Sequence, residues 1–582
     1  MRRHWSTIAF LLVFAAFFGA FLLYPVGYSV RRAFTEEVTV EPRPTTAPVQ
    51  PPSKPEPPKT RLRFTLGHLR TLFRDPTTRE GLMNSLSLAV TVTVATTLVA
   101  LPLAFWAAKY RFRGKGLLTG LIMVPLVMPP FVGAIGVRHL LARYGTINLL
   151  LGNLGLLREG QLIDFLGGGR FWGVVILETL HLFPIMYLNV TAALANVDPS
   201  LEDAGRNLGA GGWRLFRTVT FPLMLPGYFA GAVIVFIWAF TDLGTPLVFG
   251  YRRVVAVQIF DRIDKVETDP GGFALVVLVL VLTVVLFLLA RLVMRGRHFE
   301  MMSRAGRGRQ ERQPGRAHAA LIYAGFLVVF LLAVTPHLGV VLTSLAGDWF
   351  MTPLPTEYTL DHFRQAATHE LTLPSMRRSV LLASGSCLLD LMLGIWIAYV
   401  LTRKRFVGRG LLDAITMLPL ALPGVVLAFG YLGAFRIGPK SNPLPFLVIA
   451  YAVRRLPYMV RSAIAGFQQT SVTLEEASLN LGAGPARTLR KVTVPLVAAN
   501  LIAGAVLAFS FAVLEVSDSL ILALREEHYP LSKTIYTLFG RLGDGTYLAS
   551  ALGVWASLFL AATLITAGVF LGRRLGELFR AS

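Results

Sequence analysis

The sequence is poor in the residues on which many soluble enzymes and secreted domains depend. Its 582 residues include a single cysteine, Cys387, which excludes a disulfide framework and a cysteine-ligated metal cluster. Only 15% of the residues are charged and 54% are hydrophobic, which excludes soluble, collagen-like and disordered classes. No Gly-x-x-x-x-Gly-Lys-Ser/Thr phosphate-binding loop occurs, so the chain does not bind ATP in that way.

Acidic residues are also scarce, since 33 Asp and Glu stand against 56 Lys and Arg, a formal net charge of +23. A nucleic-acid-binding protein gathers such charge on one face. Here the basic residues lie mostly in short segments between apolar blocks, which is typical of the orientation signals of membrane proteins. We therefore expect a lipid bilayer around the chain and no nucleic-acid partner.

Long apolar blocks recur along the whole chain. Because about 20 apolar residues suffice to cross a bilayer as a helix, they predict an all-α polytopic membrane protein with about twelve transmembrane helices. The first block follows Arg2 and Arg3 but lacks a clear small-residue cleavage site, so we expect a retained helix rather than a signal peptide. The expected helices lie near 6–30, 83–108, 117–139, 171–194, 226–250, 272–294, 319–345, 378–402, 411–433, 444–468, 498–522 and 549–572.

The distribution of basic residues predicts which side of the membrane the loops occupy. The segments 109–115 and 403–409 carry four basic residues each, and 295–318 carries seven arginines. Loops rich in Lys and Arg favour the cytoplasm. This places the N-terminus in the cytoplasm, and an even number of spans then places the C-terminus there as well.

Proline and charge divide the chain into regions. Residues 42–58 contain eight prolines and predict an extended external linker that acts as a spacer. We expect a transmembrane helix and this linker in 1–60, a first membrane domain in 61–295, a basic cytoplasmic linker in 296–318 and a second membrane domain in 319–582.

The two membrane domains repeat one another. Residues 64–136 match 358–430 at a constant offset of 294, and the offset then falls to 273, so the loop around 140–170 is 21 residues longer than its counterpart. Each half holds six spans, an even number, so both halves enter the membrane in the same sense. They form two parallel six-span repeats, which predicts an arrangement around a central path.

The two loops that follow the fourth and tenth spans are more alike than the membrane helices around them. Residues 201–223 and 474–496 share 14 identities in 23 positions. Loops normally diverge fastest, so this similarity indicates that both loops meet the same kind of partner, although a relic of duplication is the alternative. In each loop we expect two short helices, with a glycine ending the first and a proline stopping the second before the next span. Each first helix has apolar residues on one face, which are Leu201, Ala204 and Leu208 in the first loop and Leu474, Ala477 and Leu481 in the second. Capping boxes begin at Ser200 and Thr473. The glycines are Gly209 and Gly482, and the prolines are Pro222 and Pro495.

Each of these loops resembles the EAA motif of permease subunits of bacterial ATP-binding-cassette importers. The segments that carry the resemblance are 198–223 and 471–496. In both copies an acidic residue replaces the middle alanine of the motif. The matching residues are Glu202, Asp203, Ala204, Gly209 and Pro222 in the first copy and Glu475, Glu476, Ala477, Gly482 and Pro495 in the second.

The resemblance implies a type I ABC importer permease fold, with two halves in one chain and a location in the bacterial inner membrane. It implies that each loop seats on one of two ABC ATPase copies, with Glu202 and Glu475 in contact with the ATPase. The chain is then a transport subunit and not an enzyme: it binds no cofactor or metal, ATP and Mg belong to the ATPase subunits, and an external solute-binding protein delivers the substrate. Transport by alternating access follows from a two-state motion of the halves.

The substrate implied is ferric iron, because the fused twelve-span plan and the segment 243–246 are most like ferric-iron permeases. Permeases for thiamine, phosphonate or polyamine share the plan and remain alternatives. An ion-coupled secondary transporter is a further alternative, distinguished by the absence of dependence on ATP. A membrane-embedded enzyme would need a catalytic constellation, which the sequence does not offer.

Polar residues inside predicted spans are candidates for the translocation pathway, because they are costly in hydrocarbon. Asp242 and Glu515 occupy equivalent positions at offset 273. Either they line an acidic vestibule or gate, or each pairs with a nearby arginine or lies at the membrane interface. Pro125 and Pro419, with Pro129 and Pro423, break the third and ninth spans and predict kinks that expose backbone toward a central path, or toward lipid.

Other polar residues in the spans have simpler explanations. Glu178 and His181 lie one turn apart and are expected to pair with each other. Asp390 is expected to form a hydrogen bond between packed helices. Arg454 and Arg455 are expected to face the cavity or to extend toward an interface.

Overall fold

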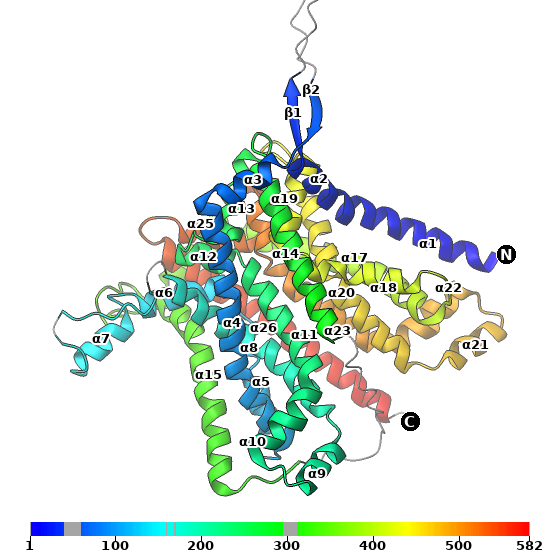
Figure 1. Ribbon diagram of the computed structural model, residues 1–582, viewed down its shortest axis with the longest axis horizontal. Coiled ribbons are helices and arrows are strands. Elements are labelled where there is room, and N and C mark those ends of the chain that lie inside the picture. Colours follow the sequence, from blue (N-terminus) through cyan, green and yellow to red (C-terminus); the bar gives the residue numbers. More distant parts are fainter. Residues whose placement is uncertain (1, 40–59, 159, 168–169, 295–310, 581–582) are drawn as a thin grey trace, which may run out of the picture.

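The computed structural model describes residues 2–39, 60–158, 160–167, 170–294 and 311–580. Within these ranges the protein is almost entirely helical (Figure 1). The sheet that is described is a hairpin in which β1 (Thr35–Thr39) pairs antiparallel with β2 (Thr60–Phe64), with Thr39 opposite Thr60. Thr39 and Thr60, where the described chain stops and resumes, therefore lie next to each other. The predicted linker 42–58 and most of the linker 296–318 lie outside the described residues.

The described residues contain nine helices that are long and apolar enough to cross a membrane, or eleven if each of two bent helix pairs counts as one span. The remaining predicted window holds α20 (Leu444–Gln469), in which three arginines interrupt an otherwise apolar helix. Each predicted window thus contains helix, which confirms an all-α polytopic membrane protein. The nine are the continuous helix α1 (Arg2–Phe18), η1 (Gly19–Leu23) and α2 (Tyr24–Ala33); α4 (Pro76–Lys109); α8 (Phe171–Ala195); the continuous helix α10 (Gly212–Leu215), η4 (Phe216–Thr220) and α11 (Phe221–Thr241); α14 (Gly271–Met294); α15 (Arg316–Leu345); α17 (Thr372–Arg403); the continuous helix α22 (Pro485–Thr488), η7 (Leu489–Thr493) and α23 (Val494–Val513); and α26 (Gly545–Arg580).

The predicted repeat recurs in the structure element by element. Four short helices of the first half begin and end at residues equivalent to those of four short helices of the second half. The longer loop of the first half contains α7 (Thr146–Asn153). The equivalent pairs are α3 (Gly67–Arg74) with α16 (Asp361–Thr368), α9 (Pro199–Asn207) with α21 (Val472–Asn480), α10 with α22, and α12 (Gly244–Phe249) with α24 (Ser517–Leu522). Two further short helices follow in each half at positions that differ: α13 (Val255–Phe260) and η5 (Ile263–Lys265) in the first, and η8 (Glu526–His528) and α25 (Leu531–Phe539) in the second.

The first span of each half packs against the other half. Helix α2 lies against α19 (Gly424–Ala434), and α15 lies against α6 (Pro130–Leu141). Glycine permits both crossings, because a Cβ at Gly430 would lie 3.0 Å from the Pro25 carbonyl oxygen, and one at Gly136 would lie 2.6 Å from that of Pro336. Gly136 and Gly430 are equivalent residues, so the duplication carries the same close contact in each half.

The third and ninth windows, 117–139 and 411–433, are bent helix pairs and not straight spans. The first pair joins α5 (Lys115–Leu121) and η2 (Val124–Leu126) to α6 at a bend of 89°, and the second joins α18 (Arg409–Met417) and η6 (Leu418–Ala421) to α19 at 98°. The predicted break is confirmed. Its cause is proline, which lacks the N–H that would continue a helix and clashes with the carbonyl four residues earlier.

Proline acts differently at Pro222 and Pro495, where the expectation of a helix stop is wrong. Each lies one residue inside α11 or α23, and a five-residue π-helical segment, η4 or η7, directly precedes that helix. A π-helical segment changes the hydrogen-bonding register, so that a helix continues past a residue without an N–H. The loops 198–223 and 471–496 therefore pass into their next spans without a break.

Candidate functional site

Each of the two similar loops forms a short helix, a tight turn and the start of the next span. The first helices, α9 and α21, are capped by Asp198 and Ser471, whose side chains accept hydrogen bonds from the N–H groups of Ser200 and Thr473. The caps thus lie two residues before the predicted capping boxes. Both caps satisfy N–H groups that a helix start leaves without partners.

Glycine ends both helices, as predicted. Gly209 and Gly482 have φ values of +81° and +85°, in the left-handed region. The N–H of Gly209 donates to the Arg206 carbonyl at 2.9 Å, and the next N–H donates to the Gly205 carbonyl at 3.0 Å; the second loop repeats both bonds. This is the Schellman arrangement, which glycine adopts without the strain that a side chain would add.

The polar face of α9 is turned into the protein. The Glu202 side chain is buried, with the residue 5% exposed, and its carboxylate lies 2.6 Å from the Lys109 ammonium at the end of α4. Thr220 donates a hydrogen bond to the same carboxylate at 2.7 Å. Asp203 pairs with Arg206 on its own helix at 2.5 Å. Glu202 thus ties the loop helix to the end of a membrane span.

The second loop repeats this attachment with an arginine. Glu475 is 7% exposed and lies 3.1 Å from Nε of Arg403 at the end of α17. Arg403 also donates to the carbonyls of Phe467 and Thr470, each at 3.0 Å, so it joins α17, the end of α20 and α21. Lys109 and Arg403 are equivalent residues. In the sequence both stand out only as members of basic loops, and no pattern there indicates that they are the partners of the glutamates.

The apolar face of each loop helix is turned outward. Leu208 is 88% exposed and Leu481 is 90% exposed. We call Leu201, Ala204 and Leu208 the first coupling surface and Leu474, Ala477 and Leu481 the second; all six are exposed. A soluble helix normally buries such a face, so both surfaces have the character of docking sites. This differs from the expectation that Glu202 and Glu475 meet a partner directly.

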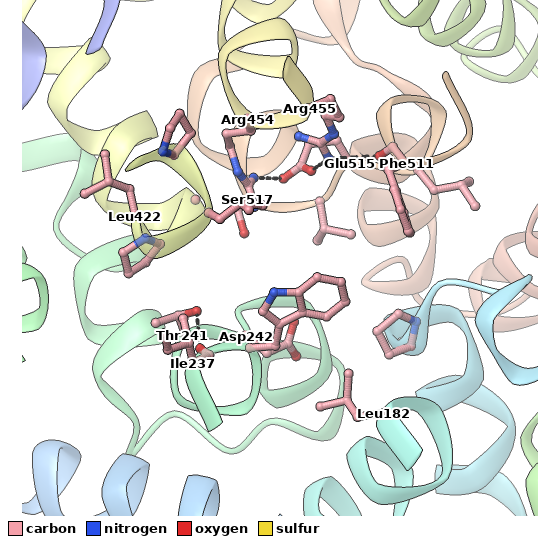
Figure 2. A pocket seen from close by; sticks show the side chains of 18 of the residues that line it. Leu182, Ile237, Thr241, Asp242, Leu422, Arg454, Arg455, Phe511, Glu515 and Ser517 are labelled. Atoms are coloured by element: carbon pink, nitrogen blue, oxygen red, sulfur yellow. Dashed lines mark hydrogen bonds and ion pairs between the residues drawn. The ribbon is translucent and has the colours of Figure 1, made fainter. Parts of the chain in front are cut away.

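A cavity of about 220 Å³ lies between the two halves (Figure 2). Equivalent residues of both halves line it, as a path along a twofold axis requires. Asp242 faces it from the break between α11 and α12, and Glu515 from the equivalent break between α23 and α24. His181 and Arg454 are a second equivalent pair, and Trp238 and Phe511 are a third.

The carboxylate of the second half is fully paired. Arg454 lies 2.5 Å from Glu515 and 3.2 Å from Asp518, and Arg455 also pairs with Glu515 (Figure 2). Arg455 donates a further bond to the Phe511 carbonyl at 2.9 Å. Of the alternatives for Glu515, facing the cavity and pairing with arginine therefore both hold.

The first half offers carboxylates without such partners. Thr245 links Asp242 and Glu178, because its N–H donates to Asp242 at 2.8 Å and its hydroxyl donates to Glu178 at 2.8 Å. In the part of the chain that the structure describes, neither carboxylate forms an ion pair with Lys or Arg. Glu178 and His181 do not pair as expected, since His181 Nδ1 contacts the Pro125 carbonyl at 3.1 Å.

The tentative pathway residues are largely brought together. Asp242, Glu515 and Pro419 line the cavity, whereas Pro125 lies beside it and reaches it through His181. Among the described residues, no group of three or more His, Cys, Asp or Glu side chains is arranged to hold a metal ion.

Comparison with known families decides what this arrangement is. Residues 100–298 and 390–576 each match the model of the family described as "Binding-protein-dependent transport system inner membrane component". The chain belongs to this family. The permease therefore carries the family domain twice, as its internal repeat predicts, and it is a multi-pass inner-membrane transport subunit rather than an enzyme.

Individual relatives match the permease over most of its length or over one half of it. The permease is 29% identical to the "Ferric transport system permease protein FbpB" of Actinobacillus pleuropneumoniae over 80% of this chain and 67% of that one. It is 29% identical to the "Putative ferric transport system permease protein FbpB 1" of Haemophilus influenzae over 75% of this chain and 68% of that one. One half resembles the "Molybdenum transport system permease protein ModB" of Haemophilus influenzae, at 29% identity over 36% of this chain and 91% of that one. As a member of this family of transport permeases, the protein acts together with an ATPase and a binding protein.

Proposed function

We propose that the two coupling surfaces each seat one copy of an ABC ATPase, so that one permease chain works with two ATPase subunits. The observation that carries this proposal is the orientation of α9 and α21, which turn a charged side toward the protein and an apolar side outward. Both helices bury a charged residue against the permease and expose leucines at 88% and 90%. A pair of equivalent, outward-facing apolar surfaces fits two copies of one partner.

The buried glutamates supply the mechanical link. Motion of an ATPase moves α9, and the Glu202–Lys109 pair at 2.6 Å carries that motion to α4. The Glu475–Arg403 pair does the same for α21 and α17. ATP shifts the permease between inward-open and outward-open states only insofar as these contacts differ between the states. ATP and Mg remain on the ATPase subunits.

The location of the coupling surfaces supports a proposal for the orientation in the membrane. In Figure 1 the C-terminal end of α26 lies low, between α9 and α21, the N-terminal end of α1 lies at the right near α22, and the β1–β2 hairpin lies at the top. We place the coupling surfaces and both termini in the cytoplasm and the hairpin outside, where a binding protein delivers the substrate. The basic loops that contain Lys109 and Arg403 then lie in the cytoplasm, as expected for Lys-rich and Arg-rich loops.

The cavity favours a cationic substrate. Arg454 and Arg455 are engaged by Glu515 and Asp518, whereas Glu178 and Asp242 have no cationic partner among the described residues. Glu178 is buried and hydrogen-bonded to Asp242, so Asp242 supplies the uncompensated negative charge of this wall, and such a charge attracts cations and repels oxyanions. Together with the two ferric transport relatives, this favours ferric iron over molybdate, and it disfavours phosphonate. Thiamine and polyamines are cationic and remain the alternatives.

ATP turnover tests the substrate. The permease is assembled with its ATPase in nanodiscs, and candidate external binding proteins are added with and without ferric iron. We expect stimulation of ATP hydrolysis by the ferric-loaded binding protein and none by a molybdate-loaded one. Stimulation by molybdate alone contradicts the assignment to ferric iron.

Transport by a double variant tests the pathway. Asp242→Asn with Glu515→Gln removes the two equivalent carboxylates that face the cavity and is expected to slow transport at least tenfold. Transport of this variant at the normal rate contradicts the role of these residues in the pathway.

A further inference from the structure

Asp390, in the middle of α17, has no hydrogen-bond partner where one was expected. The residue is 0% exposed, and neither carboxylate oxygen accepts a hydrogen bond from any described residue. A buried polar group without a partner is costly, and an unpaired one in a native protein requires an explanation. The expectation that Asp390 joins packed helices by a hydrogen bond is therefore wrong for this state of the permease.

A second unsatisfied group lies on the neighbouring helix. Nη1 of Arg455 is buried and also lacks a partner among the described residues, while Nη2 binds Glu515 and the Phe511 carbonyl. Arg455 is the charged group that acts electrostatically on Asp390. Helix α20, which carries Arg455, packs on both α17 and α23. A Cβ at Gly394 of α17 would lie 2.5 Å from Cγ of Met459 of α20, and these two residues lie one turn beyond Asp390 and Arg455, so Asp390 and Arg455 lie at the same level of the two packed helices.

The distribution of charge around these groups is uneven. Glu515 has two arginine partners, Arg454 and Arg455, whereas Asp390 has none. If Arg455 turned from Glu515 to Asp390, Glu515 would keep Arg454 and Asp390 would gain a partner. The number of arginine–carboxylate pairs stays the same, so the exchange leaves neither arginine without a carboxylate partner, and the two arrangements can serve as a two-state element.

We propose that Asp390 is the alternate partner of Arg455, and that Arg455 exchanges Glu515 for Asp390 when the permease changes state. Asp390 acts through Arg455 and is a positioning residue. The exchange frees one side of the Glu515 carboxylate toward the cavity, which makes the path more acidic in the second state. This inference rests on the proposed two-state transport.

The exchange belongs to the second half alone. The residues equivalent to Asp390 and Arg455 in the first half are Thr96 and Leu182, which cannot form an ion pair. Thr96 is 0% exposed, like Asp390, so it provides a matched control position. The two halves therefore contribute differently to the change of state in spite of their common plan.

The test measures the population of states in the assembled permease–ATPase complex in nanodiscs. Spin labels replace Arg113 and Val407, two exposed and equivalent loop residues, in a Cys387→Ser background. Distances between the labels are measured by double electron–electron resonance without nucleotide and with ATP and vanadate. The unsubstituted complex is expected to move to a second distance on addition of nucleotide.

Two variants are expected to act in opposite directions. Asp390→Asn removes the alternate partner of Arg455. With ATP and vanadate, the ratio of the second population to the resting population is therefore expected to fall at least tenfold, and Asp390→Glu is expected to restore it. Glu515→Gln weakens the resting partner and raises the second population at least tenfold without nucleotide. Thr96→Val leaves the distribution unchanged.

The outcomes separate the two proposals. A normal response of Asp390→Asn, or an unchanged resting distribution in Glu515→Gln, overturns the exchange while leaving the proposed function intact. If Asp390→Asn does not fold, the Glu515→Gln arm decides alone. If nucleotide fails to move the unsubstituted complex, the proposed two-state function is wrong, and the exchange is wrong with it.

Discussion

The exposed leucines of the coupling surfaces give the sharpest prediction. Leu208 and Leu481 lie on separate loops, and each is expected to enter a different ATPase copy. Replacing one by serine is expected to disable one docking site, and replacing both is expected to disable two. The number of ATPase subunits bound to each permease should therefore fall from two to one and then to none.

The magnitude follows from the exposed area of these side chains. Because they are 88% and 90% exposed, almost the whole side chain is available for burial by a partner. Full burial of a leucine contributes about 1.5–3 kcal/mol. Its loss weakens each site by about 10–150-fold, since about 1.4 kcal/mol corresponds to a factor of ten in the dissociation constant.

Native mass spectrometry and binding titrations measure this effect. Leu542, in the link between α25 and α26, is 100% exposed and lies outside the coupling surfaces, so Leu542→Ser is the matched control. The melting temperature of the permease alone should not change, because surface substitutions alter stability by about 0.5 kcal/mol or less. Two bound ATPase subunits and an unchanged dissociation constant in the double variant refute the reasoning.

Three further predictions concern stability and coupling. Gly209→Ala is expected to destabilise the permease by about 1–2 kcal/mol, because φ is +81° and alanine resists that conformation, while Gly209→Asn is expected to cost less; thermal unfolding distinguishes the two. Lys109→Met leaves Glu202 buried without its nearest cation, so we expect the free energy of unfolding to fall by about 3 kcal/mol and less substrate to be transported per ATP hydrolysed. Adding Glu202→Gln removes the buried charge and should restore stability. Equal stability of the single and double variants contradicts this link. The Thr78 hydroxyl donates to Asp75, the cap of α4, at 2.6 Å and holds the pKa of this carboxyl below its usual value of 3.8. The charged cap therefore stabilises the fold above about pH 3.8, and this contribution is lost as the pH falls through the lowered pKa. If the melting temperature of Asp75→Asn falls below pH 4 as much as that of the unsubstituted permease, this role is refuted.

Local and periodic features of the sequence predicted most of the fold. Apolar blocks located the helices, and the offsets of 294 and 273 predicted equivalent elements, four pairs of which have matching ends in the structure. The glycine turns at Gly209 and Gly482 were predictable because a left-handed residue depends on only a few neighbouring bonds. The breaks at Pro125 and Pro419 were predictable for the same reason.

Features that depend on distant residues were not predictable. The partner of Glu202 lies at the end of α4, and the partner of Glu475 lies at the end of α17, so the orientation of these glutamates depends on tertiary packing. The same limit applies to Arg454 and its contacts with Glu515 and Asp518. Pro222 shows a different limit, because an adjustment to a π-helical segment has no clear sequence signal.

Uptake into proteoliposomes tests the central claim most directly. The vesicles contain the permease with its ATPase, ferric-loaded binding protein is placed on one side, and ATP is placed on the side of the coupling surfaces. The account predicts ferric uptake that requires ATP and is abolished by the Leu208→Ser and Leu481→Ser double variant. Uptake that proceeds without the ATPase, driven by an ion gradient, would contradict it.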